Sequence, residues 1–184
     1  MKAKEITLGG IMIALTTIIL YSTSIIPIST LTILTIASAI VPVVIIRSNI
    51  KTAIFVYIAS SILAFFFAQI NISVLYAIFF GVYGIVKYFT ERIRKNYLEI
   101  IFKLLFFNFS FILGYVILQA IVGIDIISNL GGLIGNFIEG APEYLAIIIL
   151  WAIAQVVFYI YDYALTLIIT FYLDRIHGKG TSQK

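Results

Sequence analysis

Six long apolar runs constrain this chain more than any other feature of its sequence. Each is close to the roughly 20 residues that an α-helix needs to cross the hydrocarbon core of a bilayer. The runs cover about residues 6–26, 28–46, 52–68, 72–89, 100–122 and 144–173. Hydrophobic residues make up 62% of the 184 residues and charged residues only 11%, against about 25% charged in a typical soluble domain. The sequence therefore predicts an all-α integral membrane protein, a single domain over residues 1–184 with six transmembrane helices.

The basic residues predict the orientation of these helices. All 12 lysines and arginines fall in, or within about one turn of, the segments 1–5, 47–51, 90–99 and 174–184. Cytoplasmic segments of membrane proteins carry this excess of positive charge. We therefore expect both termini to be cytoplasmic. We also expect these side chains to meet anionic membrane lipid, and no nucleic-acid partner.

Several classes of chemistry are excluded by what the sequence lacks. There is no cysteine, and the one histidine, His177, lies in the polar tail, so we expect no disulfide, no metal site and no cofactor. The sequence contains no serine- or zinc-hydrolase motif, and we expect no enzymatic activity. It also has no phosphate-binding loop, so any ATP-driven work would need ATPase subunits in trans.

One carboxylate lies far from either end of the sixth run. A charge in hydrocarbon is costly, so Asp162 should have a partner or a water-lined cavity. It shares one helix face with Gln155 and Thr166. Counted from the predicted inner ends, Asn108 lies about 12 Å deep and Asp162 about 16 Å deep. We expect Asn108 to meet Asp162 or Thr166, with Lys103 as the nearest cation.

Two interpretations of these intramembrane polar residues stay open. In the first they form a hydrogen-bonded latch between the fifth and sixth helices. In the second the carboxylate is linked to a proton, a cation or a conformational change. The predicted polar latch consists of Asn108, Gln155 and Asp162.

Small residues recur at four-residue and three-residue steps in three of the runs. Such steps let membrane helices approach closely, within a bundle or against another protein. We expect most of them to pack the bundle, and Gly10 with Ala14 to be the pair that faces a partner. The other steps are Ser60, Ala64 and Ala68, and Ala77, Gly81 and Gly84.

The predicted outer side combines acidic and aromatic side chains without a basic residue. Such a set suits a neutral or cationic ring compound, through stacking and cation–π contact. It also suits a plain interfacial belt of aromatic rings with solvated acids. The candidate substrate-binding residues are Asn129, Glu139, Glu143, Tyr144 and Trp151.

The start of the chain resembles a known family. The stretch from Lys4 to Leu15, KEITLGGIMIAL, is similar to the opening of the substrate-binding S components of energy-coupling factor (ECF) transporters. It is equally similar to the related YybS-like bacterial membrane proteins. The second run ending at Pro42 with Arg47, and the short six-span plan with both termini inside, add to the resemblance.

The resemblance implies a vitamin or micronutrient importer subunit in the bacterial cell membrane. Such a subunit captures a small molecule from outside and delivers it with a transmembrane coupling protein and two ATPases. In the family an alanine pair on the first span contacts the coupling protein, and Gly10 and Ala14 stand at the matching positions. The alternative is a non-transporting scaffold or cell-envelope subunit resembling MreD. A ligand-sized outer cavity would favour the first, and a filled outer end would favour the second.

Overall fold

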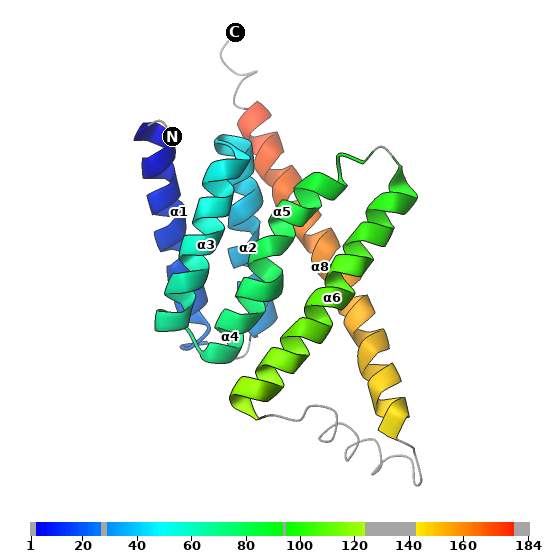
Figure 1. Ribbon diagram of the computed structural model, residues 1–184. Helices are drawn as coiled ribbons and strands as arrows, with labels where there is room; N and C mark the ends of the chain where they lie inside the picture. Colours follow the sequence, from blue (N-terminus) through cyan, green and yellow to red (C-terminus); the bar gives the residue numbers. More distant parts are fainter. Residues whose placement is uncertain (1–2, 27–28, 94, 124–142, 179–184) are drawn as a thin grey trace.

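The computed structural model describes residues 3–26, 29–93, 95–123 and 143–178, and this part of the chain is helical without a strand. Its elements are α1 (Ala3–Ser22), α2 (Thr30–Arg47), α3 (Ile50–Phe67), α4 (Ile70–Leu75), the π-helix η2 (Tyr76–Phe80), α5 (Gly81–Thr90), α6 (Asn96–Val122) and α8 (Glu143–Gly178). The elements α4, η2 and α5 follow one another without a break and form one span (Figure 1).

The six predicted transmembrane helices are confirmed. The described residues form six helices that are long and apolar enough to cross a membrane. Their ends lie within roughly five residues of the predicted boundaries, because stretches of apolar residues about as long as a bilayer is thick leave little freedom to any other fold. The protein is a multi-pass, all-α membrane bundle.

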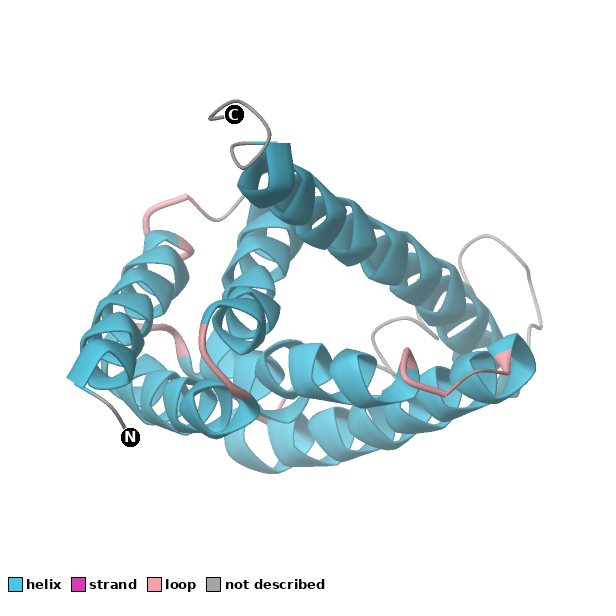
Figure 2. Ribbon diagram, turned by 90° about the horizontal axis from the view of Figure 1, so that it is seen from above, coloured by secondary structure: helices cyan, strands magenta, loops and turns pink. Residues whose placement is uncertain are grey.

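Helix α2 is central in this bundle. It contacts α1, α3, α5, η2 and α8, whereas α1 packs against only α2 and α3 among the closely packed helix pairs. Helix α6 packs along α4, η2 and α5, and α8 packs on α2. Figure 2 shows the same helices from above. The two longest described helices, α6 and α8, are not among the closely packed pairs and reach each other mainly through their side chains.

Two glycines allow the close packing of α5 against its neighbours. A Cβ atom on Gly84 would lie 2.6 Å from Cδ of Pro42 in α2. One on Gly81 would lie 2.7 Å from the ring of Tyr57 in α3. Both distances are shorter than non-bonded carbon atoms tolerate. Gly81 and Gly84 therefore act in bundle packing, as expected for most of the small-residue steps.

The small residues of α3 also pack inside the bundle. Ser60 and Ala64 are fully buried. The Ser60 hydroxyl is hydrogen-bonded to the hydroxyl of Tyr76 at 2.9 Å, and Ser73 donates to the carbonyl of Ala64 at 2.7 Å. Because α3 carries no bulky side chain here, the span of α4 and η2 approaches closely enough to form both bonds.

The π-helix is the one irregular turn within the described spans. Its wider turn weakens the regular hydrogen-bond ladder, and outside donors meet its carbonyls. Tyr57 donates from its hydroxyl to the carbonyl of Ala77 at 2.7 Å, and Ser110 donates to the carbonyl of Ile78 at 3.4 Å. The sequence pattern did not predict this segment. Short π segments are frequent at functional sites.

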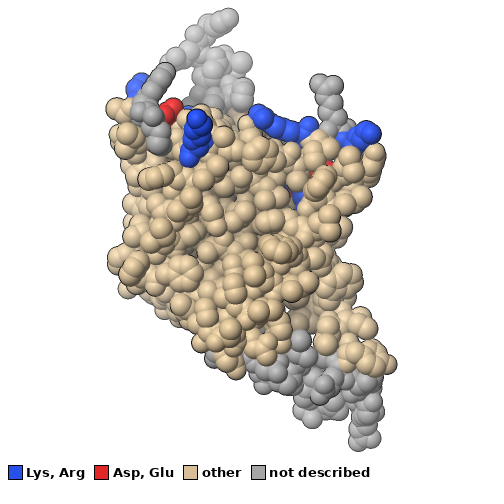
Figure 3. All heavy atoms as spheres, in the orientation of Figure 1, with Lys and Arg blue, Asp and Glu red and all other residues tan. Residues whose placement is uncertain are grey.

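Basic side chains gather at one end of the molecule, where α1 begins and α8 ends (Figure 3). The middle of the molecule shows almost only uncharged atoms in the same view. We call this the basic end, and the end at which α2 and α8 begin the opposite end. The positive-inside rule predicts that the basic end faces the cytoplasm.

Candidate functional site

Asp162 binds two lysines and a tyrosine. Its Oδ1 accepts hydrogen bonds from the Lys87 ammonium and, at 2.7 Å, from the Tyr83 hydroxyl. Its Oδ2 accepts from the Lys103 ammonium at 3.1 Å. These partners lie on α5 and α6, so the carboxylate of α8 joins three helices. The expectation that Asp162 has a partner is confirmed. Lys103 does bind Asp162, but the prediction that Lys103 is its nearest cation is wrong, because the Lys87 ammonium lies closer.

Two glutamates complete the set of charges. Glu91 lies 2.9 Å from the Lys87 ammonium, and Glu99 lies 2.7 Å from the Lys103 ammonium. We call these five residues the ionic cluster. Its members are Lys87, Glu91, Glu99, Lys103 and Asp162.

Burial makes this cluster strongly interdependent. Lys87 is only 2% exposed and Lys103 only 7% exposed. A buried ammonium without a counter-charge is costly, so the nearby carboxylates stabilise the folded state by pairing with these two lysines. Lys87 also donates to the hydroxyl of Thr166 at 2.8 Å. The cluster thus ties α5, α6 and α8 together on the basic side of the aromatic core.

Sequence reasoning missed three members of the cluster, Lys87, Glu91 and Glu99, and Lys87 is the most deeply buried of them. It lies about one turn before the end of its span, so it is read as one of the boundary lysines that orient the protein. A long lysine side chain can also point inward from such a place. The signal that could have found it is the spacing of four residues to Glu91, which marks a helical ion pair.

The predicted meeting of Asn108 with Asp162 differs from the structure. Oδ1 of Asn108 accepts hydrogen bonds from the indole of Trp151 at 2.7 Å and from Gln155 at 3.0 Å. The predicted latch residues Asn108 and Gln155 therefore do meet, and Asp162 belongs to the ionic cluster. Counting residues from the helix ends gave the wrong partner because α6 and α8 are inclined in opposite directions (Figure 1), so equal counts along the two helices do not give equal heights.

A cavity of about 640 Å³ lies beside the aromatic side chains of the core, which separate it from the ionic cluster. Residues near the start of α2 line it, including Leu31 and Thr35, together with residues of α6 such as Phe111 and Gly114. Its lining residues come mainly from the half of α2 and of α6 nearer the opposite end, and from the middle of α8, residues 150–168. The cavity therefore lies in the middle of the bundle and extends towards the opposite end. Its volume is typical of pockets that hold drug-sized ligands.

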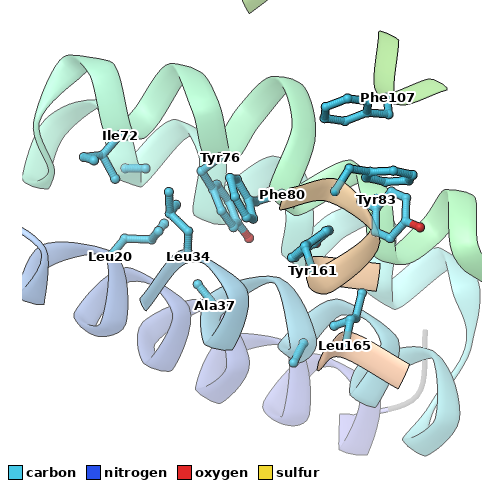
Figure 4. Close-up of a cluster of buried hydrophobic side chains, with 13 residues drawn as sticks. Leu20, Leu34, Ala37, Ile72, Tyr76, Phe80, Tyr83, Phe107, Tyr161 and Leu165 are labelled. Carbon is cyan, nitrogen blue, oxygen red and sulfur yellow. The ribbon is translucent and has the colours of Figure 1, made fainter. Parts of the chain in front are cut away.

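Aromatic rings form the floor of this cavity. They come from η2, α6 and α8, and Phe107 stacks on Phe158 with ring centroids 4.5 Å apart. Figure 4 shows the rings from these elements lying together in the core. We call this set the aromatic floor. Its members are Phe79, Phe80, Phe107, Phe158 and Tyr161.

Tyr83 connects the aromatic floor to the ionic cluster. Its ring lies 5.2 Å from the ring of Tyr161 and 5.4 Å from that of Phe79, measured between centroids. Its hydroxyl is the donor to Asp162 described above. The cavity, the rings and the charges thus follow one another along a single line of contacts.

The predicted substrate-binding residues are placed in part. Asn129 and Glu139 lie outside the described residues. Glu143 begins α8, and Tyr144 is exposed one residue later. Trp151 is half exposed and is bonded to Asn108, and neither Trp151 nor Tyr144 lines the cavity.

The predicted partner-binding pair lies on an uncovered face of α1. Gly10 and Ala14 are exposed, and a Cβ added to Gly10 would meet no atom within 4 Å. Gly9, in contrast, is buried against Thr52 and Val56 of α3. Among the described residues, both small residues are therefore exposed at the surface of the bundle, unlike the buried Gly81 and Gly84.

Within the described residues no cluster of acidic or histidine side chains is arranged to hold a metal ion. Comparison with family models, with curated proteins and with solved structures finds no match. The cavity, the ionic cluster and the exposed face of α1 are therefore the features that bear on function.

Proposed function

We propose that this protein is the membrane-embedded substrate-binding subunit of an ATP-driven nutrient importer of the ECF type. The observation that carries the proposal is the 640 Å³ cavity, which extends from the middle of the bundle towards the opposite end. By the positive-inside rule this end faces away from the cytoplasm. A ligand-sized hollow there is what a subunit that captures a small molecule from outside requires. A scaffold resembling MreD has no use for it.

The closed basic side supports the same proposal. Tyr83 connects the aromatic floor of the cavity to the ionic cluster, and on this proposal these side chains leave a bound molecule no open route to the basic end. Delivery then needs a rearrangement of the whole subunit, and the chain has no phosphate-binding loop with which to drive one. A transmembrane coupling protein and two ATPase subunits would supply that work.

The exposed face of α1 is the proposed docking surface for the coupling protein. Gly10 and Ala14 present almost no side-chain bulk, so a helix of the partner can approach the backbone of α1 closely. Within the bundle nothing else covers Gly10. The proposed site of action is the bacterial cell membrane, where such importers work.

Native mass spectrometry of the purified full-length protein tests the proposal. We expect a small molecule to be retained by the wild-type protein. Gly114 lines the cavity, and a Cβ added there meets no atom within 4 Å, so Gly114→Leu should fill the cavity and lose that molecule. Repeated preparations of folded wild-type protein without any bound molecule would count against the proposal, as would equal retention by Gly114→Leu.

A further inference from the structure

We propose that the cavity takes a neutral, largely apolar, ring-bearing molecule, and that it discriminates against cations and anions of the same size. The inference narrows the ligand of the proposed function, and it rests on that function only in taking this molecule to be the transported compound. It departs from the expectation of a neutral or cationic ligand bound by acidic and aromatic residues.

The wall of the cavity is uncharged. None of the described residues that line it carries a formal charge. The nearest carboxylate with a known place in the core, Asp162, lies behind the aromatic floor and is already bound by two lysines. A charged ligand would lose its hydration without gaining a counter-charge, which is costly in an apolar surrounding.

The aromatic rings that line the cavity contact one another in stacked and edge-on arrangements. Phe107 and Phe158 are stacked, and Phe79 meets Phe107 nearly edge-on, with centroids 5.7 Å apart. Phe111 continues this set up the cavity wall, 5.8 Å from Phe107. Aromatic groups attract one another in these arrangements beyond the gain from burial alone. A planar ring in the cavity would extend the same packing, whereas a flexible acyl chain would gain only from burial.

The few polar side chains along the wall all carry hydroxyls: they are Thr32, Thr35, Ser110, Tyr115 and Tyr161. The hydroxyls of Thr35 and Ser110 each donate their hydrogen to a backbone carbonyl, at 2.8 Å and 3.4 Å. Their oxygen atoms keep lone pairs with which to accept a further bond. The wall therefore offers acceptors to one or two neutral donor groups, such as a hydroxyl or an amide of the ligand.

The rim of the cavity, where its lining residues reach the surface of the bundle, includes Ile36 and Ile160. Ile36 of α2 and Ile160 of α8 line the cavity and are 47% and 64% exposed at the surface of the bundle. Since both positions lie inside membrane-spanning helices, the rim meets lipid. A molecule that partitions into lipid can reach the cavity between α2 and α8, and an ion cannot do so cheaply.

Thermal unfolding of the full-length protein in detergent tests the inference with three probes of known chemistry. The probes are β-naphthol as a neutral ring, β-naphthylmethylammonium as a cation of similar size, and decanol as a neutral chain. A ligand that binds only the folded state raises the unfolding midpoint. We expect β-naphthol at saturation to raise it by about 4 °C and the other two probes to raise it by less than half as much.

Cavity-filling variants locate the binding. Gly114→Leu should abolish the β-naphthol shift, and Ala154→Leu, from the α8 wall of the same cavity, provides a second filler if the first unfolds. Ile112→Phe adds bulk to an exposed position of α6 outside the cavity and should keep the full shift. A shift that survives both fillers, an equal shift with the ammonium or with decanol, or no shift with any probe would overturn the inference.

Failure of the importer proposal would look different. In that case the neutral probe still binds and the fillers still block it. ATP-dependent uptake, measured after reconstitution with a coupling protein and two ATPases, would be absent. Conversely, uptake of a charged compound that Gly114→Leu abolishes would leave the importer standing and overturn the neutral ligand class.

Discussion

The hydroxyl of Tyr83 donates a hydrogen bond of 2.7 Å to the carboxylate of Asp162, while its ring packs against the aromatic floor of the cavity. One side chain therefore touches both the apolar and the ionic part of the core. A ligand that shifts the floor would move Tyr83, and with it a bond that holds α5 to α8. This arrangement offers a physical route from the cavity to the basic end of the bundle.

Removing only this hydroxyl should weaken the bundle without disturbing its packing. We expect Tyr83→Phe to lower the free energy of unfolding by about 1 kcal/mol, because hydrogen bonds in membrane bundles contribute roughly 0.6–2 kcal/mol. Unfolding by denaturing detergent in bicelles would measure it. Tyr88→Phe is the matched control, because Tyr88 lies on the same helix but is not one of the side chains that donate to Asp162. Equal losses in the two variants would contradict the role of Tyr83.

Neutralising the shared carboxylate should be among the most harmful single changes. Asp162→Asn leaves two buried lysines with only Glu91 and Glu99 as counter-charges, and removing one partner of a buried ion pair typically costs about 3–5 kcal/mol. We expect Lys87→Met in the same chain to recover part of this loss, because it removes the cation that was left unpaired. A double variant as unstable as the sum of its two single variants would refute this coupling.

The hydrogen bonds of Asn108 are separate from the ionic cluster around Asp162. The two groups should therefore contribute independently to the free energy of unfolding. Asn108→Leu breaks the bonds to Trp151 and Gln155 and leaves the ionic cluster intact. We expect its effect and that of Asp162→Asn on the free energy of unfolding to add within about 0.5 kcal/mol. A coupling energy above about 1 kcal/mol in this double-mutant cycle would show that the two groups act as one latch after all.

The same substitution should have opposite effects at two glycines. Gly84→Ala places a Cβ 2.6 Å from Pro42, so α5 or α2 must shift, and overpacking of this kind costs about 1–3 kcal/mol. Gly114→Ala meets open space and should be neutral or slightly stabilising, since alanine favours the helix. Thermal unfolding of both variants checks the contrast. A Gly84→Ala variant as stable as Gly114→Ala would mean that the α2–α5 contact is looser than described.

The docking surface of α1 gives a prediction about uptake. Gly10→Leu adds bulk where no residue of the bundle lies within 4 Å of a new Cβ atom, so the subunit itself should fold and bind β-naphthol as before. Uptake in the reconstituted importer should fall about tenfold or more, because the coupling protein can no longer approach α1 closely. Unchanged uptake would remove Gly10 from the partner surface. Ile112→Phe, an equally exposed change on α6, controls for added bulk.

The sequence predicted the bundle well because a bilayer allows few alternatives. The six spans follow from apolar length, and the need of Asp162 for a partner follows from the cost of a charge in hydrocarbon. The cavity could not be predicted, because apolar residues that face a cavity, a neighbouring helix or lipid look the same in a sequence. Ile160 and Leu165 illustrate this: one is exposed at the cavity rim and the other is fully buried.

The errors at the site have equally physical causes. The predicted partners of Asn108 are wrong because the count along the helix axes treats α6 and α8 as upright, whereas the two helices are inclined in opposite directions (Figure 1). Lys87 was assigned to the boundary because the length of its side chain was not counted. The π-helix leaves no periodic signal in five residues, although it places Phe79 and Phe80 in the aromatic floor.

The members of the ionic cluster are translated at different times, because they lie far apart in the sequence. Lys87 and Lys103 precede Asp162 by 75 and 59 residues, so at ordinary rates of translation they are made roughly 3–15 seconds before it. During that interval Glu91 and Glu99, each four residues from its lysine, are the carboxylates at hand. Helix α8, which is made later, then supplies the carboxylate that joins α5 to α6.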